Sequence, residues 1–555
     1  MSADIFNETM KENVVNESFM SGSIFNSFLT ATFGLVVTLA LYDYWRRNTR
    51  SYKLMKNIPN PKEYPIVAHS YLVFFRNNPE ILETFVDLIK NVGETIRVSL
   101  GHVNSIVISN PVDVEIFLSG QKHLEKSKEY RFFKPWFGDG LLISKGHHWR
   151  HHRKMIAPTF HQSILKSFVP TFVQHSNAVC DRLLAKAGKE FDCHKYMSET
   201  TVNILLTTAM GVKKQPELET SAKYAQAVMD MCDIIHTRQM KMLYRLDALY
   251  RLTSMRQKDN KLMNIILSMT RKVVEERKKN FNADERAVVD KNGTFPVNKT
   301  IKEKKEGLRD DLDDIDENDV GEKKRLALLD AMMEMEKNPD ITWTDKDVMD
   351  EVNTIMFEGH DTTAAGSSFA LCMLGIHQDV QQRVIEEQET IFGHDMRRDC
   401  TFADTIQMNY LERVICETLR LFPPVPLIAR KAEEDIKLAS GPYIVPKGTA
   451  VLISQFVIHR RGDVYPDPDK FDPDRFLPER TAQRHYYSFI PFSAGPRSCV
   501  GRKFAMLQLK VLLSTIIRKY KVFSSRTDKD FRLQGDIILK LTNGFQISLE
   551  PRTYA

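Results

Sequence analysis

Phe492-Ser-Ala-Gly495-Pro-Arg497-Ser-Cys499-Val-Gly501 lies near the C-terminus, directly ahead of a long apolar segment. A cysteine thiolate ligates haem iron and favours O–O cleavage over reversible O2 binding. The two glycines allow a tight turn and bring backbone N–H groups close to the sulfur, while Arg497 offers a fixed cation to a haem propionate. A lone cysteine is usually a small buried hydrophobic residue, but that reading leaves the other fixed positions unexplained. The spacing therefore predicts that Cys499 ligates haem iron.

This stretch resembles the haem-binding loop of the cytochromes P-450, Phe-x-x-Gly-x-Arg-x-Cys-x-Gly, and the resemblance extends over roughly residues 50–550. It implies an α+β, mostly α-helical P-450 fold with small peripheral sheets. It also implies haem b as the cofactor and electrons from NADPH through a separate NADPH-cytochrome P-450 reductase. The pattern of the chain agrees, because residues 95–109 predict a β-hairpin, most of 110–420 has helical periodicity, and 425–460 alternates short strands with turns.

A second motif lies inside a predicted helix over residues 344–377, with Thr344 as its N-cap. Residues 357–363 read Phe-Glu-Gly-His-Asp-Thr-Thr and resemble the distal-helix motif of the same family. The resemblance implies that Thr362 contacts the oxygen being activated and that Asp361 relays protons from solvent. Glycine beside acid and hydroxyl groups also predicts a local opening of the helix. A polar stripe on an exposed helix is the alternative, and the apolar flanks disfavour it.

Glu358 occupies a position that is usually alanine or glycine in this motif. A carboxylate beside haem is costly unless it is paired or chemically consumed. In mammalian members of P-450 family 4 the same string carries a glutamate that esterifies a haem methyl group. By resemblance, Glu358 is a candidate for that covalent bond.

Two further patterns surround the predicted haem site. Glu417 and Arg420 lie three residues apart on a predicted helix, and Arg475 follows within a Phe-Asp-Pro-Asp-Arg-Phe string. The resemblance implies that these three form a buried structural triad behind the haem. It further implies that the haem propionates are bound by four residues, Trp149, Arg153, Arg430 and Arg497.

Basic residues near both regions predict a positive face on which a negatively charged reductase docks. Ordinary solvated charge is the alternative explanation. The residues are Arg150, His151, His152, Lys154, Arg502, Lys503 and Lys510.

The N-terminal region predicts a membrane anchor. Residues 24–41 contain no charged side chain, aromatic residues follow, and five basic residues lie between 46 and 56. The positive-inside rule places the N-terminus in the lumen of the endoplasmic reticulum and the body in the cytosol. A helix lying in the membrane interface is the alternative. Asn7 and Asn16 begin glycosylation sequons on the lumenal side.

Composition narrows the class of protein further. The net charge of +6 is modest for 555 residues and does not indicate nucleic-acid binding. Seven scattered cysteines, an odd number without Cys-x-x-Cys pairs, argue against a disulfide framework and against a zinc site. The resulting organisation is a lumenal segment at 1–23, an anchor at 24–44, a basic, proline-rich linker at 45–65 and a haem-thiolate monooxygenase domain at 66–555.

Residues 282–323 form an insertion in that domain, with eight acidic and no basic residues between Asp310 and Glu322. Its composition predicts a flexible, solvated loop. The insertion, the FEGHDTTAAG string and Arg131–Gly140 resemble subfamily G of P-450 family 4, which is specific to insects. That subfamily is implicated in cuticular hydrocarbon synthesis.

The resemblance implies a membrane-bound monooxygenase acting on lipophilic long-chain substrates, with oxidative decarbonylation of long-chain fatty aldehydes as the leading hypothesis. A fatty-acid ω-hydroxylase or an enzyme oxidising xenobiotics or hormones is the main alternative. A haem-thiolate isomerase would not need Asp361 and Thr362. A non-catalytic haem-binding or lipid-binding protein should have lost one of the motif positions.

Overall fold

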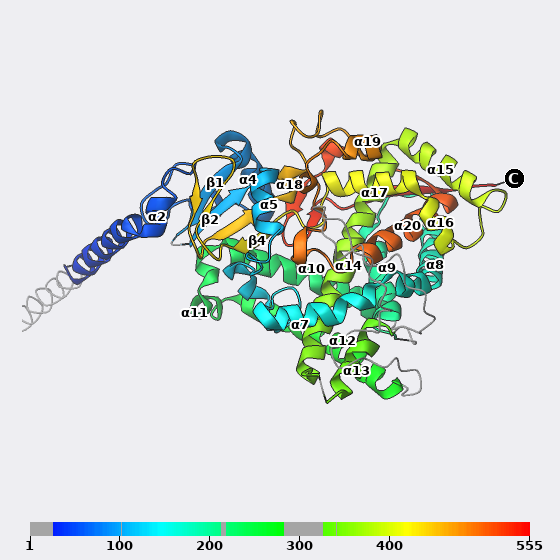
Figure 1. Ribbon diagram of the computed structural model, residues 1–555, viewed down its shortest axis with the longest axis horizontal. Coiled ribbons are helices and arrows are strands. Elements are labelled where there is room, and N and C mark those ends of the chain that lie inside the picture. Colours follow the sequence, from blue (N-terminus) through cyan, green and yellow to red (C-terminus); the bar gives the residue numbers. More distant parts are fainter. Residues whose placement is uncertain (1–25, 102, 213–217, 282–325, 340, 555) are drawn as a thin grey trace, which may run out of the picture.

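Helices make up most of the body in the computed structural model, which describes residues 26–101, 103–212, 218–281, 326–339 and 341–554 (Figure 1). The long helices are α4 (Asn78–Val92), α7 (Gly146–Ile156), α8 (Gln162–Leu184), α9 (His194–Thr208), α10 (Leu218–Met240), α12 (Ser254–Asn280), α13 (Leu328–Lys337), α14 (Asp345–Ile376), α15 (Gln378–Phe392), α17 (Asn409–Leu421) and α20 (Arg502–Lys519). Shorter helices are α2 (Arg50–Leu54), α3 (Tyr71–Phe74), α5 (Pro111–Leu118), α6 (Lys134–Phe137), α11 (Asp247–Tyr250), α16 (Phe402–Gln407), α18 (Gln455–Ile458) and α19 (Pro478–Thr481).

Small sheets lie at the edges of this helical body. The largest has the order β1-β2-β7-β4, from β1 (Thr95–Leu100), β2 (Val103–Ile108), β7 (Ala450–Ile453) and β4 (Ile428–Lys431). The others pair β3 (Phe191–Asp192), β11 (Gln546–Pro551) and β8 (Tyr520–Phe523), then β9 (Leu533–Gly535) with β10 (Leu539–Leu541), and β5 (Ile436–Lys437) with β6 (Ile444–Val445). The predicted hairpin and the mostly α-helical α+β class are both confirmed.

Helix α14 runs through the middle of the helical region and is buried along most of its length (Figure 1). The predicted N-cap is confirmed, because the Thr344 hydroxyl accepts a hydrogen bond from the backbone N–H of Asp347, and the Asp347 carboxylate accepts one from the N–H of Thr344. The predicted local opening is not present, since α14 is continuous from Asp345 to Ile376. The Thr362 hydroxyl instead donates to the carbonyl oxygen of Glu358, 2.8 Å away within the same helix.

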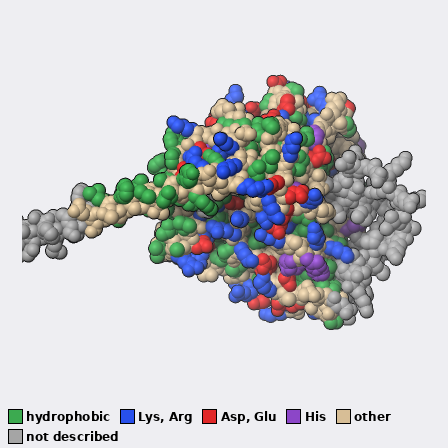
Figure 2. Space-filling model, turned by 60° about the vertical axis from the view of Figure 1, so that its left-hand side comes forward, with side chains coloured by type: hydrophobic (Ala, Val, Ile, Leu, Met, Phe, Trp, Pro, Cys, Tyr) green, Lys and Arg blue, Asp and Glu red, His purple; other side chains and the backbone are tan. Residues whose placement is uncertain are grey.

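One apolar helix, Asn26–Asn48, projects from the body beside the largest sheet (Figure 1). It is long enough to cross a bilayer, and only 6% of its most apolar window is buried. Figure 2 shows hydrophobic side chains along this helix and on the adjoining part of the body. The segment at 1–23, both sequons and the insertion at 282–323 lie outside the described residues.

The segment after this helix packs on the body, whereas its prolines predict a simple stiff spacer. It contains α2, and Met55 and Ile58 are buried against Ile106 and Phe117. Its charges are paired as well, because buried Arg46 contacts Glu63, and Glu63 contacts Arg97 of β1. These contacts join the apolar helix to the sheet.

Candidate active site

An internal cavity of about 400 Å³ lies between α14 and the loop that carries Cys499. Apolar side chains dominate its wall, with Phe133, Leu205 and Ile538 among them. Glu358, Thr362 and Cys499 also line it. The cysteine motif and the distal-helix motif therefore face the same cavity, although 137 residues separate Thr362 from Cys499 in the sequence.

The loop around Cys499 has a backbone that only glycine permits at one position. Gly495 has a φ of +70°, and a Cβ atom there would lie 1.7 Å from the carbonyl oxygen of Leu118. The backbone N–H of Cys499 donates to the carbonyl oxygen of Phe492, 2.9 Å away, which closes the turn. Helix α20 begins three residues after the cysteine, at Arg502.

The Cys499 thiol lines the cavity and is exposed to it. Burial raises its pKa to about 11, and the nearby Glu358 carboxylate contributes to the rise, whereas a hydrogen bond from the backbone N–H of Gly501 lowers it. A bound metal ion overrides such a shift, because a coordinating thiol is deprotonated outright. Cys499 is thus a thiol that becomes a thiolate when it binds metal.

On the opposite wall, Glu358 and Thr362 stand one helical turn apart on α14 and both reach the cavity. Burial raises the pKa of Glu358 to about 7, while Lys126 and Arg153 favour its charged form. Gly359 permits close packing here, because a Cβ atom at this position would lie 2.9 Å from Leu205 of α9.

The Asp361 side chain lies away from the cavity. The described residues that line the cavity include Thr362 but not Asp361, which is 3% exposed. Burial raises its pKa to about 7, and its charge influences Tyr224 and Cys232 of α10. The structure therefore separates the two predicted catalytic residues, with the hydroxyl at the cavity and the carboxyl on the side toward α10.

Positive charges are concentrated on one side of the cavity, where Trp149, Arg153 and Arg497 form part of its wall. The Arg497 guanidinium lies over the Trp149 ring and donates to the carbonyl oxygens of Leu141, at 3.1 Å, and Ser144, at 2.6 Å. Burial, together with repulsion from Arg430, lowers the pKa of Arg497 to about 9.

This arrangement fits a haem. Arg430 is 1% exposed, and neither of its terminal nitrogens has a hydrogen-bond partner within the described part of the chain. Arg430 is not among the described residues that line the cavity, but it repels Arg497, which does line it. Burying unpaired cations is costly, so a doubly anionic ligand beside Arg153 and Arg497 would relieve the cost. Two haem propionates would supply that charge, and Cys499 would supply the iron ligand.

A buried ion network joins α17 to the segment that follows α18. The Glu417 carboxylate receives two hydrogen bonds from Arg420, at 2.7 and 2.8 Å, and lies 3.4 Å from the Nε atom of Arg475. Arg420 also donates to the carbonyl oxygens of His459, at 2.9 Å, and Pro468, at 2.6 Å. These contacts join the acid, the two arginines and the loop after α18, and Glu417 and Arg420 are fully buried.

Sequence reasoning missed several residues of this cavity. Lys126 is buried in the wall, where burial and the neighbouring arginines hold its pKa well below the usual range. His236 and Asp536 place polar atoms on another part of the wall, 3.9 Å apart. Nothing in the local sequence signals these positions, because each comes from a segment without a recognised motif.

Two members of the predicted positive face are not free surface charges. His152 is 2% exposed, its pKa is lowered by burial to about 4, and its Nδ1 atom contacts Glu351. Lys510 is 9% exposed and pairs with Glu412 at 2.6 Å. A face on which the reductase docks would therefore have to consist of the other basic residues of the predicted positive face.

Known proteins share this combination of fold and motifs. The family model for cytochrome P450 matches residues 59–549. The chain is 64% identical to cytochrome P450 4g1 of Drosophila melanogaster over the full length of both chains. It is 46% identical to cytochrome P450 4g15 of the same species, across 94% of this chain and 97% of that one. It is 34% identical to human cytochrome P450 4V2, across 94% of each.

The chain therefore belongs to the cytochrome P450 family, whose members are haem-thiolate monooxygenases. Within that family it belongs to family 4, and its full-length similarity to cytochrome P450 4g1 places it in the insect subfamily G. Haem with thiolate-ligated iron is the family's cofactor, and a reductase supplies the electrons.

Proposed function

We propose that this P450 is anchored in the endoplasmic reticulum membrane and oxidises long-chain lipids, with oxidative decarbonylation of long-chain fatty aldehydes as its reaction. The observation that carries the proposal is the apolar cavity, which extends from Cys499 to Leu72, Val73 and Met240. Such a cavity selects a lipophilic substrate. The choice of decarbonylation rests on the resemblance to subfamily G.

The far end of the cavity lies beside an exposed apolar face. That face comprises Phe74, Phe75, Leu243, Leu246, Leu249 and Leu252. Its two segments are joined by Lys241, whose ammonium group donates to the carbonyl oxygen of Phe74, 3.1 Å away. A face this apolar favours contact with a bilayer. With the N-terminal helix in the membrane and the N-terminus in the lumen, the substrate would enter from the cytosolic leaflet.

Haem bound to Cys499 supplies the oxygen-activating chemistry. Trp149, Arg153, Arg430 and Arg497 would hold its propionates, and the buried triad of Glu417, Arg420 and Arg475 would keep the cysteine loop in place. Thr362 holds a hydroxyl at the cavity wall, whereas Asp361 lies on the side of α10 and would pass protons to the cavity only through intervening groups. Glu358 lies in the cavity wall and would form the covalent ester with haem that the resemblance implies.

The overall reaction balances with the family's usual co-substrates. One O2, two electrons and two protons convert the aldehyde into a hydrocarbon one carbon shorter, CO2 and water. NADPH provides the electrons through the reductase, which would dock on the exposed basic residues near Arg150 and Arg502.

The test is reconstitution of the full-length protein with reductase, NADPH and O2, using a long-chain aldehyde and the matching acid in separate reactions. Gas chromatography with mass spectrometry should detect a hydrocarbon one carbon shorter from the aldehyde. An ω-hydroxy acid as the main product would instead identify a fatty-acid ω-hydroxylase and overturn the decarbonylase assignment. Protein carrying Cys499→Ala is the inactive control, and Cys416→Ala, on α17, is the matched cysteine control.

A further inference from the structure

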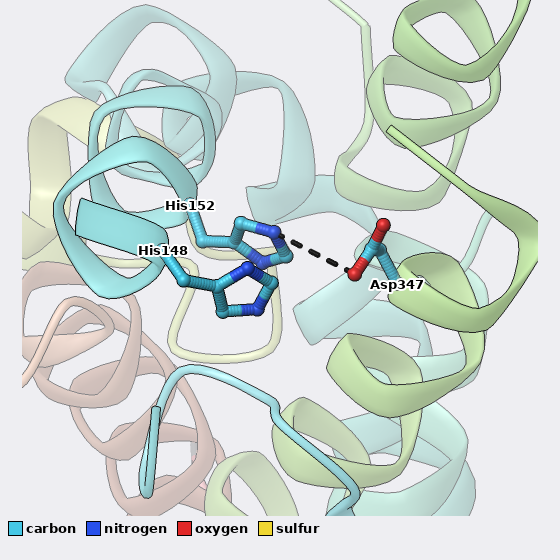
Figure 3. Close-up of side chains that lie close together, drawn as sticks. All are labelled: His148, His152 and Asp347. Carbon is cyan, nitrogen blue, oxygen red and sulfur yellow. Dashed lines mark ion pairs between the residues drawn. The ribbon is translucent and has the colours of Figure 1, made fainter. Parts of the chain in front are cut away.

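Two histidines and an aspartate meet outside the cavity, where α7 passes the first turn of α14 (Figure 3). One potential ligand atom from each of His148, His152 and Asp347 lies within 4.8 Å of the other two. The Nε2 atom of His152 is 3.8 Å from Asp347 Oδ1. Among the described residues, no other three such side chains come this close. His152 is buried, and the other two are half-buried.

Both imidazole rings are held by their second nitrogen. His152 Nδ1 lies 2.6 Å from the Glu351 carboxylate, which leaves Nε2 facing Asp347. His148 Nε2 lies 3.1 Å from the carbonyl oxygen of Asp139, which can only accept, so that this nitrogen carries the proton and Nδ1 keeps its lone pair. Metal-binding histidines almost always donate their other ring N–H to a carboxylate or a backbone carbonyl. Both rings already have this partner.

The helix cap uses only one of the two carboxylate oxygens of Asp347. Asp347 Oδ2 accepts hydrogen bonds from the backbone N–H and the hydroxyl of Thr344, at 2.9 and 2.6 Å. The cap therefore fixes the carboxylate, and its Oδ1 atom is directed toward His152. All three side chains are oriented by contacts that leave a ligand atom for a cation.

We propose that His148, His152 and Asp347 bind a transition-metal dication of the Zn²⁺ type, with water completing the coordination. Tetrahedral zinc with bonds of 2.0–2.1 Å places its ligand atoms about 3.4 Å apart, so shifts of an ångström or less would close the site. Two imidazoles with a single carboxylate oxygen do not suit Mg²⁺ or Ca²⁺, which require more oxygen ligands.

The position of His152 has a simpler partial explanation. Its hydrogen bond to Glu351 and its stacking on Trp343, 4.2 Å between ring centres, would hold it without any metal. The cap at Thr344 and the contact with Asp139 likewise hold Asp347 and His148, but none of these contacts uses Asp347 Oδ1, His152 Nε2 or the free ring nitrogen of His148. The neighbouring pair, His147 and His151, has the same four-residue spacing on α7 but no carboxylate in ligand range among the described residues.

Metal binding here would link two helices of the active site. His148 and His152 directly precede Trp149 and Arg153, which line the cavity, while α14 also carries Thr362. A cation shared by α7 and α14 would therefore fix the helix that bears the predicted propionate ligands. It would stabilise the folded protein against heat, because a ligand that binds only the native state raises the unfolding temperature.

The test uses full-length haem-loaded protein freed of metal with a chelator and titrated with ZnCl2 in a calorimeter. We expect one Zn²⁺ per chain and, from zinc X-ray absorption, two imidazole nitrogens at about 2.0–2.1 Å. His148→Gln should weaken binding by at least about tenfold and abolish the zinc-dependent rise in melting temperature. His147→Gln is the matched control on the same helix and should bind like the natural protein.

Two results would overturn the proposal. One is the absence of stoichiometric zinc binding at sub-millimolar concentration. The other is binding that survives His148→Gln or that is lost with His147→Gln, which would place the metal on the other histidine pair. The melting temperature in chelator and the haem content show that each variant is folded, so a failed variant cannot be mistaken for a lost site.

Discussion

The guanidinium carbon of Arg497 lies 4.0 Å from the centre of the Trp149 ring. This contact joins the loop of the predicted iron ligand to α7, which also carries Arg153. A guanidinium over an indole face is stabilised by the ring quadrupole and keeps its fork of N–H donors in one plane. This contact thus joins the side wall of the cavity to the cysteine loop.

The assignment of Cys499 as iron ligand predicts a spectroscopic change. Cys499→Ala should abolish the red-shifted Soret band of the reduced, CO-bound protein, because no thiolate remains to donate charge to the iron. The measurement is a CO difference spectrum. Cys416→Ala should keep the band, since Cys416 is not among the described residues that line the cavity. An unchanged band in Cys499→Ala would refute the assignment.

The second prediction is that Arg430→Met has opposite effects on the haem-free and the haem-loaded protein. Arg430→Met removes a buried cation without hydrogen-bond partners in the described chain, so the haem-free protein should unfold at a higher denaturant concentration. The haem-loaded protein should lose haem about 10–100 times faster, because a charge-assisted bond of about 1.5–3 kcal/mol is missing. Haem transfer to apomyoglobin measures the rate.

Lys431→Met on the same strand is the control, because Lys431 pairs with Glu125 and not with the cavity. Its haem loss should match that of the natural protein. Faster haem loss in both variants would point to disruption of β4 and would contradict a specific role for Arg430.

The Glu417–Arg420 pair should be sensitive to loss of one partner. Glu417→Gln leaves Arg420 charged and fully buried, which costs about 3–5 kcal/mol of folding free energy. The exposed pair of Arg383 and Asp474 offers the contrast, since Asp474→Asn should cost about 0–1 kcal/mol. Denaturant unfolding of both variants checks the difference. Similar costs at the two sites would contradict a structural role for the buried network.

Glu358 gives a prediction about how haem is attached. If its carboxylate forms the ester, acid–organic extraction of turned-over protein should leave haem on the polypeptide, and mass spectrometry should find it on the peptide containing residue 358. Glu358→Ala should release the haem completely. Full extraction from the natural protein after turnover would show that the carboxylate remains free in the cavity wall.

Motifs with fixed spacing could be predicted from the sequence, because local geometry determines them. The cysteine loop, the N-cap at Thr344 and the meeting of Glu417 with Arg420 each need only a turn or one helical repeat. Contacts made by distant segments could not be predicted. Lys126 enters the cavity wall, and His152 is buried, only through tertiary packing.

The direction of Asp361 is an intermediate case. On a helix with 3.6 residues per turn, Glu358 and Thr362 share a face, while Asp361 is rotated by about 100° from Thr362. The phase of the helix therefore indicates that the acid and the hydroxyl diverge. The sequence motif suggests a common function for Asp361 and Thr362. It does not by itself show that the two side chains lie on different sides of the helix.

The burial of Asp361 leads to a pH-dependent stability. Its pKa lies near 7 in the folded protein but near 3.8 when exposed, so in this interval the folded state holds a proton that the unfolded state has lost. Its contribution to stability is present below pH 3.8 and is lost as the pH rises to about 7. In Asp361→Asn this pH-dependent loss of stability does not occur, since the amide does not ionise.

The variant should therefore gain stability relative to the natural protein as the pH rises from 4 to 7, and the difference should stay constant above pH 7. Chemical unfolding at several pH values measures the two curves. Parallel curves for Asp361→Asn would mean that the carboxyl is already ionised in the folded state, and a protonated donor at this position would then be excluded near neutral pH.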